Sequence, residues 1–126
     1  DAAASLAERM RYAVSKHRYH IGRSGVARTS CSLGFALYPF VRAAPGLVTW
    51  EDVIRLADAA LYRAKSRRNA WVGWSGVTAV PHLVNRIVGD PDTAEQEGFL
   101  STRVSEATSG ETIELFLRRP VALRGR

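Results

Sequence analysis

The strongest constraint on the fold is an amphipathic helix pattern that lies between two segments with the pattern of β-strands. Residues 26–40 (VARTSCSLGFALYPF) alternate between large and small side chains, which is the period of a strand. Residues 70–74 (AWVGW) are short, apolar and aromatic, and they predict a second strand. A strand, a helix and a strand in this order predict a right-handed crossover within one sheet.

The first predicted strand has one bulky face and one small face. The bulky face would carry Cys31, Leu33, Phe35 and Leu37. The small face would carry Ser30, Ser32, Gly34 and Ala36. A small face allows a helix or a ligand to approach the strand backbone closely. We assign packing roles to the two serines, because no base partner for a nucleophile is evident in the sequence.

The predicted helix has a defined start and a basic end. The Thr49 hydroxyl can accept a hydrogen bond from the Asp52 amide while the Asp52 carboxylate reaches back, which is the pattern of a capping box. Its apolar stripe is narrow and rich in alanine: Val53, Ile54, Ala57, Ala60, Leu61 and Ala64. Lys65, Arg67 and Arg68 follow at the C-terminal end, where cations favour the helix dipole even without a ligand.

Helical periodicity also predicts a helix over residues 2–21, closed by Gly22. Its apolar stripe comprises Leu6, Met10, Ala13, Val14 and His17. His17 and His20 could bind a metal, but no second cluster of Cys, Asp or Glu supports such a site, so we predict none. Residues 22–25 (GRSG) predict a turn between this helix and the first strand.

Residues 76–126 differ in character from the first 75. They predict a short helix within residues 81–98, closed by a Gly-Asp-Pro-Asp turn. Two weakly alternating segments, residues 98–107 and 111–123, could pair as a hairpin. We therefore predict a helix-strand-helix-strand unit of an α/β or α+β fold over residues 1–75, followed by a C-terminal extension over residues 76–126.

The basic character of the chain belongs to its first part. The formal net charge is +6, and residues 1–75 hold twelve Lys and Arg against five Asp and Glu, whereas residues 76–126 hold six against seven. This distribution suggests a polyanionic partner, such as a nucleotide or a nucleic acid, although a solvated basic surface would look the same. The absence of a long apolar run, of an export segment and of a second cysteine beside Cys31 favours a reducing, cytoplasmic setting without membrane contact.

Three segments together resemble the C-terminal half of the GGDEF domain, the catalytic domain of diguanylate cyclases. That family shows a strand of the form T-x-S-x-G-x-A, then A-D-x-A-L-Y-x-A-K, and then G-R-N before the next strand. The strand pattern is filled here by Ser30, Ser32, Gly34 and Ala36, with Ser in place of Thr. The helix pattern is filled by Ala57, Asp58, Ala60, Leu61, Tyr62, Ala64 and Lys65, and the last pattern by Arg68 and Asn69. The resemblance covers roughly residues 2–74, since LAERMRYAV also looks like a family helix.

The resemblance implies a partial nucleotide-cyclase-like fold, an α+β sandwich, and a role in bacterial second-messenger signalling. The family joins two GTP molecules into cyclic di-GMP with loss of two pyrophosphates, in a homodimer whose two domains each hold one GTP. Mg²⁺ ions activate the nucleophile and neutralise developing charge. The family positions that match Lys65 and Arg68 contact the phosphates, where cations stabilise the charge of the leaving pyrophosphate.

Two departures from the family pattern limit what this chain is expected to do. The segment KSRRN is one residue short and has Arg67 in place of the family's Gly, so Arg67 could replace Arg68 as the phosphate contact. The GGDEF signature is absent, and so is the product-inhibition motif R-x-x-D that the family carries upstream of that signature. In the family the signature hairpin helps to supply metal-binding carboxylates and guanine contacts. We therefore predict no catalytic residue and no metal ligand in this chain. We expect a fragment that does not make cyclic di-GMP alone.

Two alternatives stay open beside an active cyclase. A degenerate domain could bind a guanine nucleotide or a protein partner without catalysis, and a basic module could bind nucleic acid. We predict no nucleic-acid partner, because the sequence lacks a helix-turn-helix spacing, a zinc pattern and an RNA-binding aromatic signature. Asp58 is assigned a structural hydrogen bond, and Tyr62 is expected to pack with its hydroxyl at the surface. A sheet cut at residue 1 would leave an open edge, which the residues after 76 or a second chain would cover.

Overall fold

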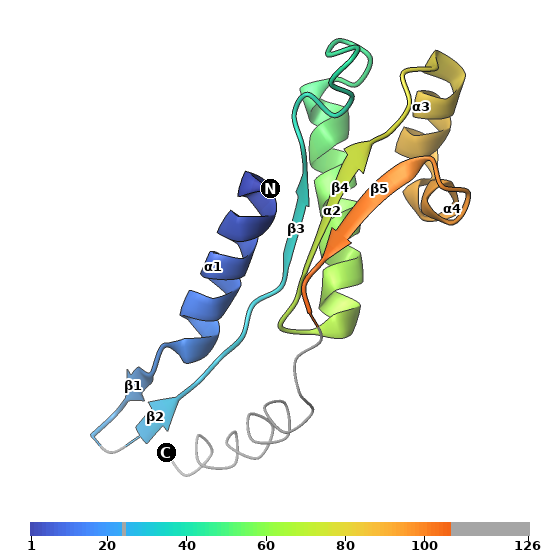
Figure 1. Ribbon diagram of the computed structural model, residues 1–126. Coiled ribbons are helices and arrows are strands. Elements are labelled where there is room, and N and C mark those ends of the chain that lie inside the picture. The colour runs from blue at the N-terminus through green and yellow to red at the C-terminus, as the bar shows by residue number, and fades with distance from the viewer. Residues whose placement is uncertain (24, 107–126) are drawn as a thin grey trace.

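The computed structural model describes residues 1–23 and 25–106 (Figure 1). Helices and strands are mixed along the chain, which confirms the predicted α+β class. In chain order they are α1 (Ala2–Lys16), β1 (Tyr19–Ile21), β2 (Gly25–Ala27), β3 (Leu33–Ala36), α2 (Trp50–Arg67), β4 (Trp71–Gly76), α3 (Pro81–Gly89), α4 (Pro91–Gln96) and β5 (Leu100–Val104).

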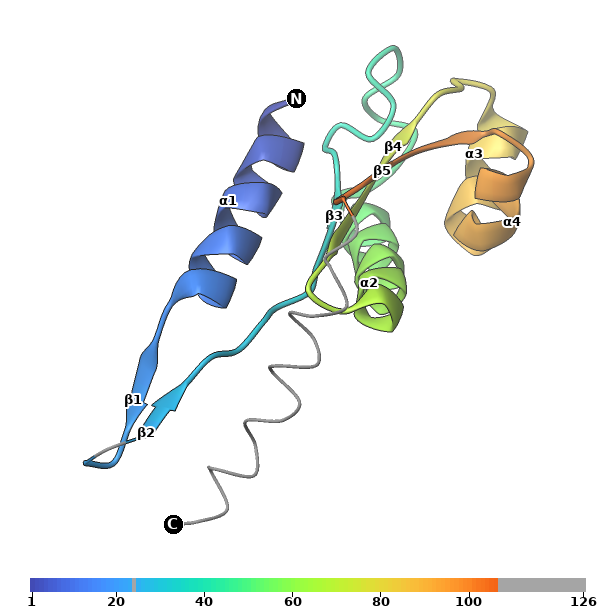
Figure 2. The ribbon, with the colours of Figure 1, turned by 60° about the horizontal axis from the view of Figure 1, so that its bottom comes forward.

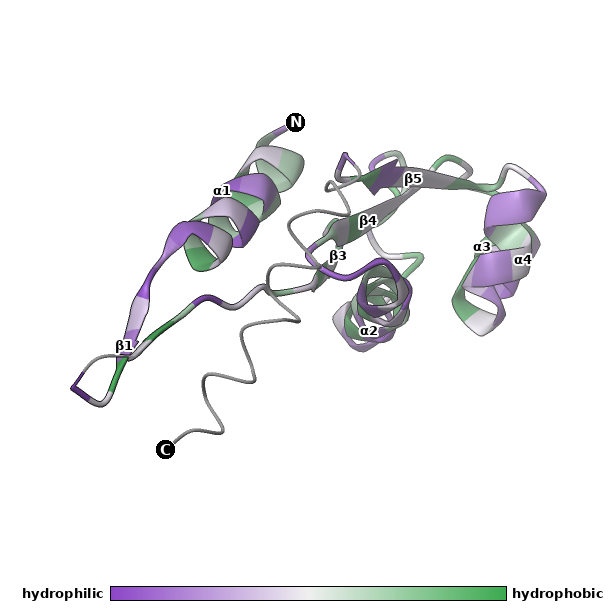
Figure 3. Cartoon of the chain, turned by 90° about the horizontal axis from the view of Figure 1, so that it is seen from below, coloured by the Kyte–Doolittle hydropathy of each residue, from purple (hydrophilic) through white to green (hydrophobic). Residues whose placement is uncertain are grey.

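The main sheet has the strand order β3-β4-β5 within the described residues. Strands β3 and β4 are parallel, with Leu33 opposite Trp71 and Ala36 opposite Trp74, and α2 connects them. The predicted strand-helix-strand crossover is therefore confirmed. Strand β5 runs antiparallel to β4 on its other side. Figure 3 shows α2 against one face of this sheet, with α1 on the opposite side, beyond β3.

Helix α2 packs on the small face of β3, as the sequence predicts. A methyl group on Gly34 would overlap the backbone of Leu61 and of Ala57 in the helix. Ala60 and Ala64 of the same helix are completely buried. The Thr49 hydroxyl accepts a hydrogen bond from the Asp52 amide at 3.2 Å, so half of the predicted capping box is confirmed. The Asp52 carboxylate instead accepts a hydrogen bond from Arg55.

The main core lies between α2, the sheet and the two helices that follow β4. Its largest fully buried side chains come from both sides of residue 75: Phe40, Leu56, Val72, Trp74, Val84 and Ile87. Ala94 and Leu100 complete the cluster from α4 and β5. Figure 2 shows α3 and α4 beside the sheet, at the end away from α1. Residues 76–106 thus close the part of the core that α2 and β4 leave uncovered.

The predicted helix over residues 2–21 is wrong in its last part. Helix α1 ends at Lys16, and Tyr19–Ile21 pairs with Gly25–Ala27 in an antiparallel ladder around the predicted turn. Gly22 has a φ of 63°, which lets the chain reverse there. The predicted strand over residues 26–40 is likewise two strands, because β2 pairs with β1 while β3 pairs with β4.

The predicted core face of α1 is also wrong. Ala4 and Ala7 are buried against Trp71, whereas Leu6 is 55% exposed and Met10 is 50% exposed. The small alanines let the helix approach the Trp71 ring closely. Polar contacts from the neighbouring turn of α1 to β4 fix the rotation of the helix about its axis.

The predicted C-terminal hairpin is corrected in part. Leu100–Val104 is a strand, but its partner is β4, and residues 107–126 lie outside the described residues. The predicted helix after residue 81 is confirmed as α3, and α4 follows directly from the Asp90 cap. Strand β5 covers one edge of β4, while the outer edge of β3 has no strand partner among residues 1–23 and 25–106. No helix in these ranges is long and apolar enough to cross a bilayer.

Candidate functional site

The turn between α2 and β4 carries the predicted phosphate-binding residues in an unusual backbone conformation. Arg68 is the C-cap of α2, and its amide donates to the Ala64 carbonyl at 3.0 Å. Its φ and ψ are 58° and 146°, and Asn69 follows with a φ of 45°. Positive φ is uncommon outside glycine, although Asn tolerates it better than most residues. These two residues turn the chain from the helix into β4.

Lys65 and Arg68 are both exposed at the C-terminal end of α2. Lys65 lies one turn beyond Leu61, the residue whose backbone contacts Gly34 of β3, and therefore on the β3 side of the helix. Neither cation forms an ion pair with any residue of the described ranges. The helix end thus presents two positive side chains beside the negative end of the helix dipole, and no carboxylate of residues 1–23 or 25–106 pairs with them.

Arg67 is engaged elsewhere. Its Nη2 donates a hydrogen bond of 3.0 Å to the Ser105 carbonyl, just after β5. Ser105 is buried, its hydroxyl accepts from the Trp71 amide at 3.1 Å, and its own amide donates to the Trp71 carbonyl at 3.0 Å. Arg67 therefore ties the end of α2 to β5. This geometry favours Arg68 over Arg67 as the cation that can contact a ligand.

A polar cluster on α1 reaches the same turn from the other side. Arg11 donates twice to the Glu8 carboxylate, at 2.5 and 3.0 Å, and its Nη1 donates to Asn69 Oδ1 at 3.1 Å. The Trp71 indole nitrogen donates to Glu8 at 2.8 Å. Asn69 is 7% exposed, so its side-chain oxygen has exchanged water for the guanidinium. This cluster was not predicted from the sequence.

The charges of this cluster support one another. The pKa of Glu8 is lowered, chiefly by the hydrogen bonds from Arg11 and further by the Trp71 bond and the Arg11 charge, while burial opposes the shift. The pKa of Arg11 is raised, chiefly by its hydrogen bonds to Glu8. Both groups are therefore charged near neutral pH. Cys31 lies in the field of Arg11, but burial dominates and raises the pKa of its thiol.

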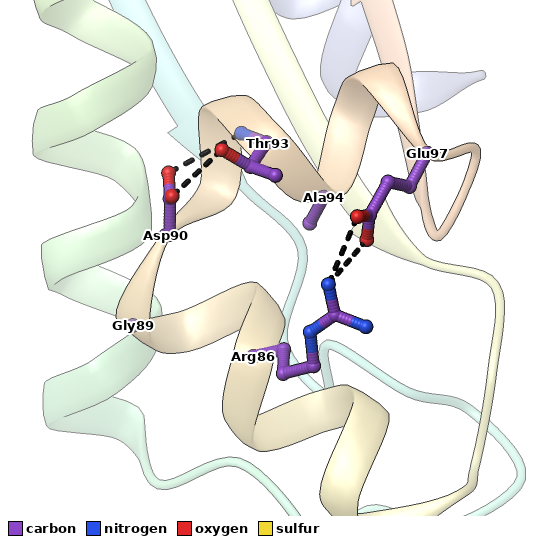
Figure 4. Close-up of a pocket in the computed structure, with 6 residues that line it drawn as sticks. All are labelled: Arg86, Gly89, Asp90, Thr93, Ala94 and Glu97. Carbon is purple, nitrogen blue, oxygen red and sulfur yellow. Dashed lines mark hydrogen bonds and ion pairs between the residues drawn. The ribbon is translucent and has the colours of Figure 1, made fainter.

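Two hollows lie away from this turn. The first, of about 200 Å³, lies between α3 and α4 and is lined by Arg86, Gly89, Asp90, Thr93, Ala94 and Glu97 (Figure 4). Its polar groups are already paired: Arg86 donates to both oxygens of Glu97, and Thr93 donates to Asp90. The Thr93 bonds lower the pKa of the Asp90 carboxyl. These pairs fasten two short helices to one another.

The second hollow is an open groove of about 650 Å³ between α2 and α4. Its lining residues are Tyr62, Arg63, Ser66, Asp92, Glu95 and Gln96. Arg63 forms ion pairs with Glu95 and, at 3.7 Å, with Asp92. The single cation that lines the groove is therefore paired, and its two carboxylates leave the lining with a formal charge of −1, which does not favour an anionic ligand. Neither this groove nor the first hollow is lined by Lys65 or Arg68.

The other predicted residues have more ordinary surroundings. Tyr62 is 78% exposed, so its predicted packing is wrong. Asp58 is exposed, and its carboxylate accepts no hydrogen bond from the residues that the structure describes, which leaves its predicted structural role without support. His17 contacts the Tyr19 ring edge-on, with ring centroids 4.4 Å apart. Within the described ranges, no three His, Cys, Asp or Glu residues are grouped closely enough to hold a metal ion.

No protein-family model matches the chain, and no curated protein or solved structure is significantly similar to it. A functional assignment therefore depends on the residue pattern and on the geometry of the α2–β4 turn.

Proposed function

We propose that this chain is the C-terminal part of a GGDEF domain, in a diguanylate cyclase that condenses two GTP molecules into cyclic di-GMP. In this proposal Lys65 and Arg68 bind the phosphates of GTP or cyclic di-GMP. The observation that carries the proposal is the placement of both cations, exposed and without an ion pair to a described residue, at the end of the helix that crosses from β3 to β4. The neighbouring Arg67 instead donates a hydrogen bond to the Ser105 carbonyl.

The exposed positions of the helix pattern give further support. Packing accounts for several of the pattern's residues, because Ala57 contacts β3 and Ala60 and Ala64 are buried. Packing does not account for Tyr62 or Lys65, which are exposed. A helix that only had to cover a sheet would accept almost any polar residue there. A match at such positions therefore favours a role in binding.

The two cations suit a polyphosphate in complementary ways. A guanidinium can form two parallel hydrogen bonds to phosphate oxygens, whereas an ammonium acts as a compact positive charge on a flexible stem. Together they would hold the triphosphate and stabilise the charge that accumulates on the leaving pyrophosphate. When bound, Mg²⁺ would supply activation of the attacking hydroxyl, and its ligands are expected outside the described residues.

The alternative is a degenerate domain that binds a nucleotide or a protein partner without catalysis. The lack of a carboxylate cluster within residues 1–23 and 25–106 favours this alternative for the chain as it stands. Both versions share the phosphate contacts of Lys65 and Arg68. They differ in whether GTP is turned over. The proposed homodimer is needed only for the active cyclase.

A GTP-binding titration of the full chain by calorimetry tests the shared part. We expect Lys65→Ala and Arg68→Ala each to weaken binding about tenfold, because a charge-assisted hydrogen bond contributes about 1.5–3 kcal/mol. Arg55→Ala is the matched control, since Arg55 lies on the same helix but pairs with Asp52. ATP should bind about as well as GTP, because the guanine contacts are expected elsewhere. Equal affinities for the chain and both variants would refute the site.

Turnover is tested separately by incubating the chain with GTP and Mg²⁺. We expect no cyclic di-GMP from the chain alone. Clear product would contradict the view that the metal ligands lie outside it.

A further inference from the structure

The backbone of Arg68 is strained and must be held in place by its surroundings. Its φ of 58° and ψ of 146° lie in a region that is almost exclusive to glycine. The segment KSRRN contains no glycine that could adopt this conformation instead. A residue with a side chain persists there only where neighbouring contacts over-determine its conformation.

Contacts on both sides of Arg68 supply this restraint. Before it, the Arg67 guanidinium is bonded to the Ser105 carbonyl. After it, the Asn69 side chain accepts the hydrogen bond of 3.1 Å from Arg11, across 58 positions of sequence. Arg11 is itself held by two bonds to Glu8, whose carboxylate is also bonded to the Trp71 indole. Groups from α1, β4 and the end of β5 therefore fix the two residues that flank Arg68, which are Arg67 and Asn69.

The Arg11–Asn69 hydrogen bond does more than attach α1 to the sheet. Helix α1 already packs Ala4 and Ala7 on Trp71, and Glu8 is bonded to the same ring. Asn69 adds a contact to the turn itself, at the residue that directly follows the exposed Arg68 in the chain. Its amide is nine-tenths buried, so loss of the Arg11 bond would leave that oxygen unpaired and would release the turn.

We infer that Asn69, clamped by Arg11 of α1, is a positioning residue that holds the Arg68 guanidinium where it and Lys65 can bind one polyphosphate together. The inference rests on the proposed phosphate site. It adds that the site depends on α1, a helix that supplies neither cation. The clamp has a distinct signature, because its effect on binding must pass through Arg68.

The test is a double-mutant cycle on the full chain, with inorganic tripolyphosphate as the calorimetric probe. Asn69→Gly tolerates the positive φ and removes the side-chain amide, including the oxygen that Arg11 contacts, so it is the first variant. We expect it to weaken binding roughly fivefold, within the coupling range of contacting residues, with the helical circular dichroism unchanged. In the Arg68→Ala background the same change should have no further effect.

A second variant guards against failure of Asn69→Gly to fold. Arg11→Lys keeps the positive charge on α1 but loses the fork that reaches Glu8 and Asn69 together, and it leaves the sequence of the turn untouched. We expect it to reproduce the loss of affinity, again only when Arg68 is present. A purely structural cluster would lower the melting temperature of these variants and leave tripolyphosphate affinity unchanged, or would lower affinity equally in both backgrounds. Either result overturns the inference.

The cycle also separates this inference from the proposed function. If Lys65→Ala and Arg68→Ala weaken binding while Asn69→Gly and Arg11→Lys do not, the phosphate site stands and the positioning role is wrong. If the unaltered chain does not bind tripolyphosphate, both are wrong.

Discussion

Helices α1 and α2 contact the same sheet, yet α2 buries more of the apolar stripe that its sequence predicts. Val53, Ala60 and Ala64 of that stripe are buried, whereas Ile54 is 51% exposed, and Leu56, which lies outside the predicted stripe, is buried as well. Helix α1 buries two alanines and exposes Leu6 and Met10. The difference shows that periodicity identifies a helix, whereas its rotation is set by the partners present. The polar contacts from Glu8 to Trp71 and from Arg11 to Asn69 set this rotation, and they leave Leu6 and Met10 exposed.

The largest change in stability is expected when one leucine is replaced in each helix. Leu56→Ala should lower the free energy of unfolding by about 3 kcal/mol, because Leu56 is 1% exposed and the change leaves a cavity in the core. Leu6→Ala should change it by less than about 0.5 kcal/mol, since that side chain is half in solvent. Urea denaturation followed by circular dichroism measures both. Similar losses for the two leucines would mean that α1 is buried in solution in a way that the structure does not show.

A smaller effect tests the close contact that orients α2. Gly34→Ala should destabilise the chain by about 2 kcal/mol, because the new methyl group would overlap helix backbone that cannot move aside. Gly46→Ala is the matched control, since a methyl group there meets nothing within 4 Å. The same urea titration applies. If Gly34→Ala were as stable as the control, the register of α2 over β3 would be wrong.

The smallest expected effect tests the polar contacts that orient α1. The folded state lowers the pKa of Glu8, so the ionised form contributes stability above the ordinary carboxyl pKa, and this contribution is lost as the pH falls through the lowered value. Glu8→Gln mimics the protonated side chain. The variant should therefore be less stable than the parent at neutral pH, and the two urea midpoints should converge in the acid range. A difference that stays constant with pH would contradict the Glu8–Arg11 pairing.

Local patterns predicted the elements around α2 well. The Thr49 cap, the alanine stripe and the small face of β3 are each encoded within a short stretch of sequence, so the crossover could be predicted. The rotation of α1 could not be predicted, because Glu8 and Arg11 find their partners at Trp71 and Asn69, which lie 63 and 58 positions away. The partner of β5 was missed for the same reason, since a nearby hairpin and a distant strand give similar alternation.

The residues of the candidate site likewise divide into features that local patterns predict and features that depend on distant partners. Lys65 and Arg68 could be found from the spacing of the helix pattern, and the structure places both at the exposed end of α2. The pairing of Arg67 with Ser105 spans 38 positions and has no signal in the sequence. The positive φ of Arg68 and Asn69 also could not be predicted. The segment KSRRN has Arg67 where the family pattern has a glycine, and this indicates only that some residue of the turn must adopt an unfavourable conformation.

The central claim is that a polyphosphate binds at the α2–β4 turn and not at the hollow between α3 and α4. A titration of the isotope-labelled chain with GTP, followed through backbone amide chemical shifts, tests it most directly. The account predicts that the largest shifts fall on residues 64–69 and on Arg11, with Arg86, Asp90 and Glu97 unaffected. Shifts centred on the α3–α4 hollow, or none at saturating GTP, would contradict it.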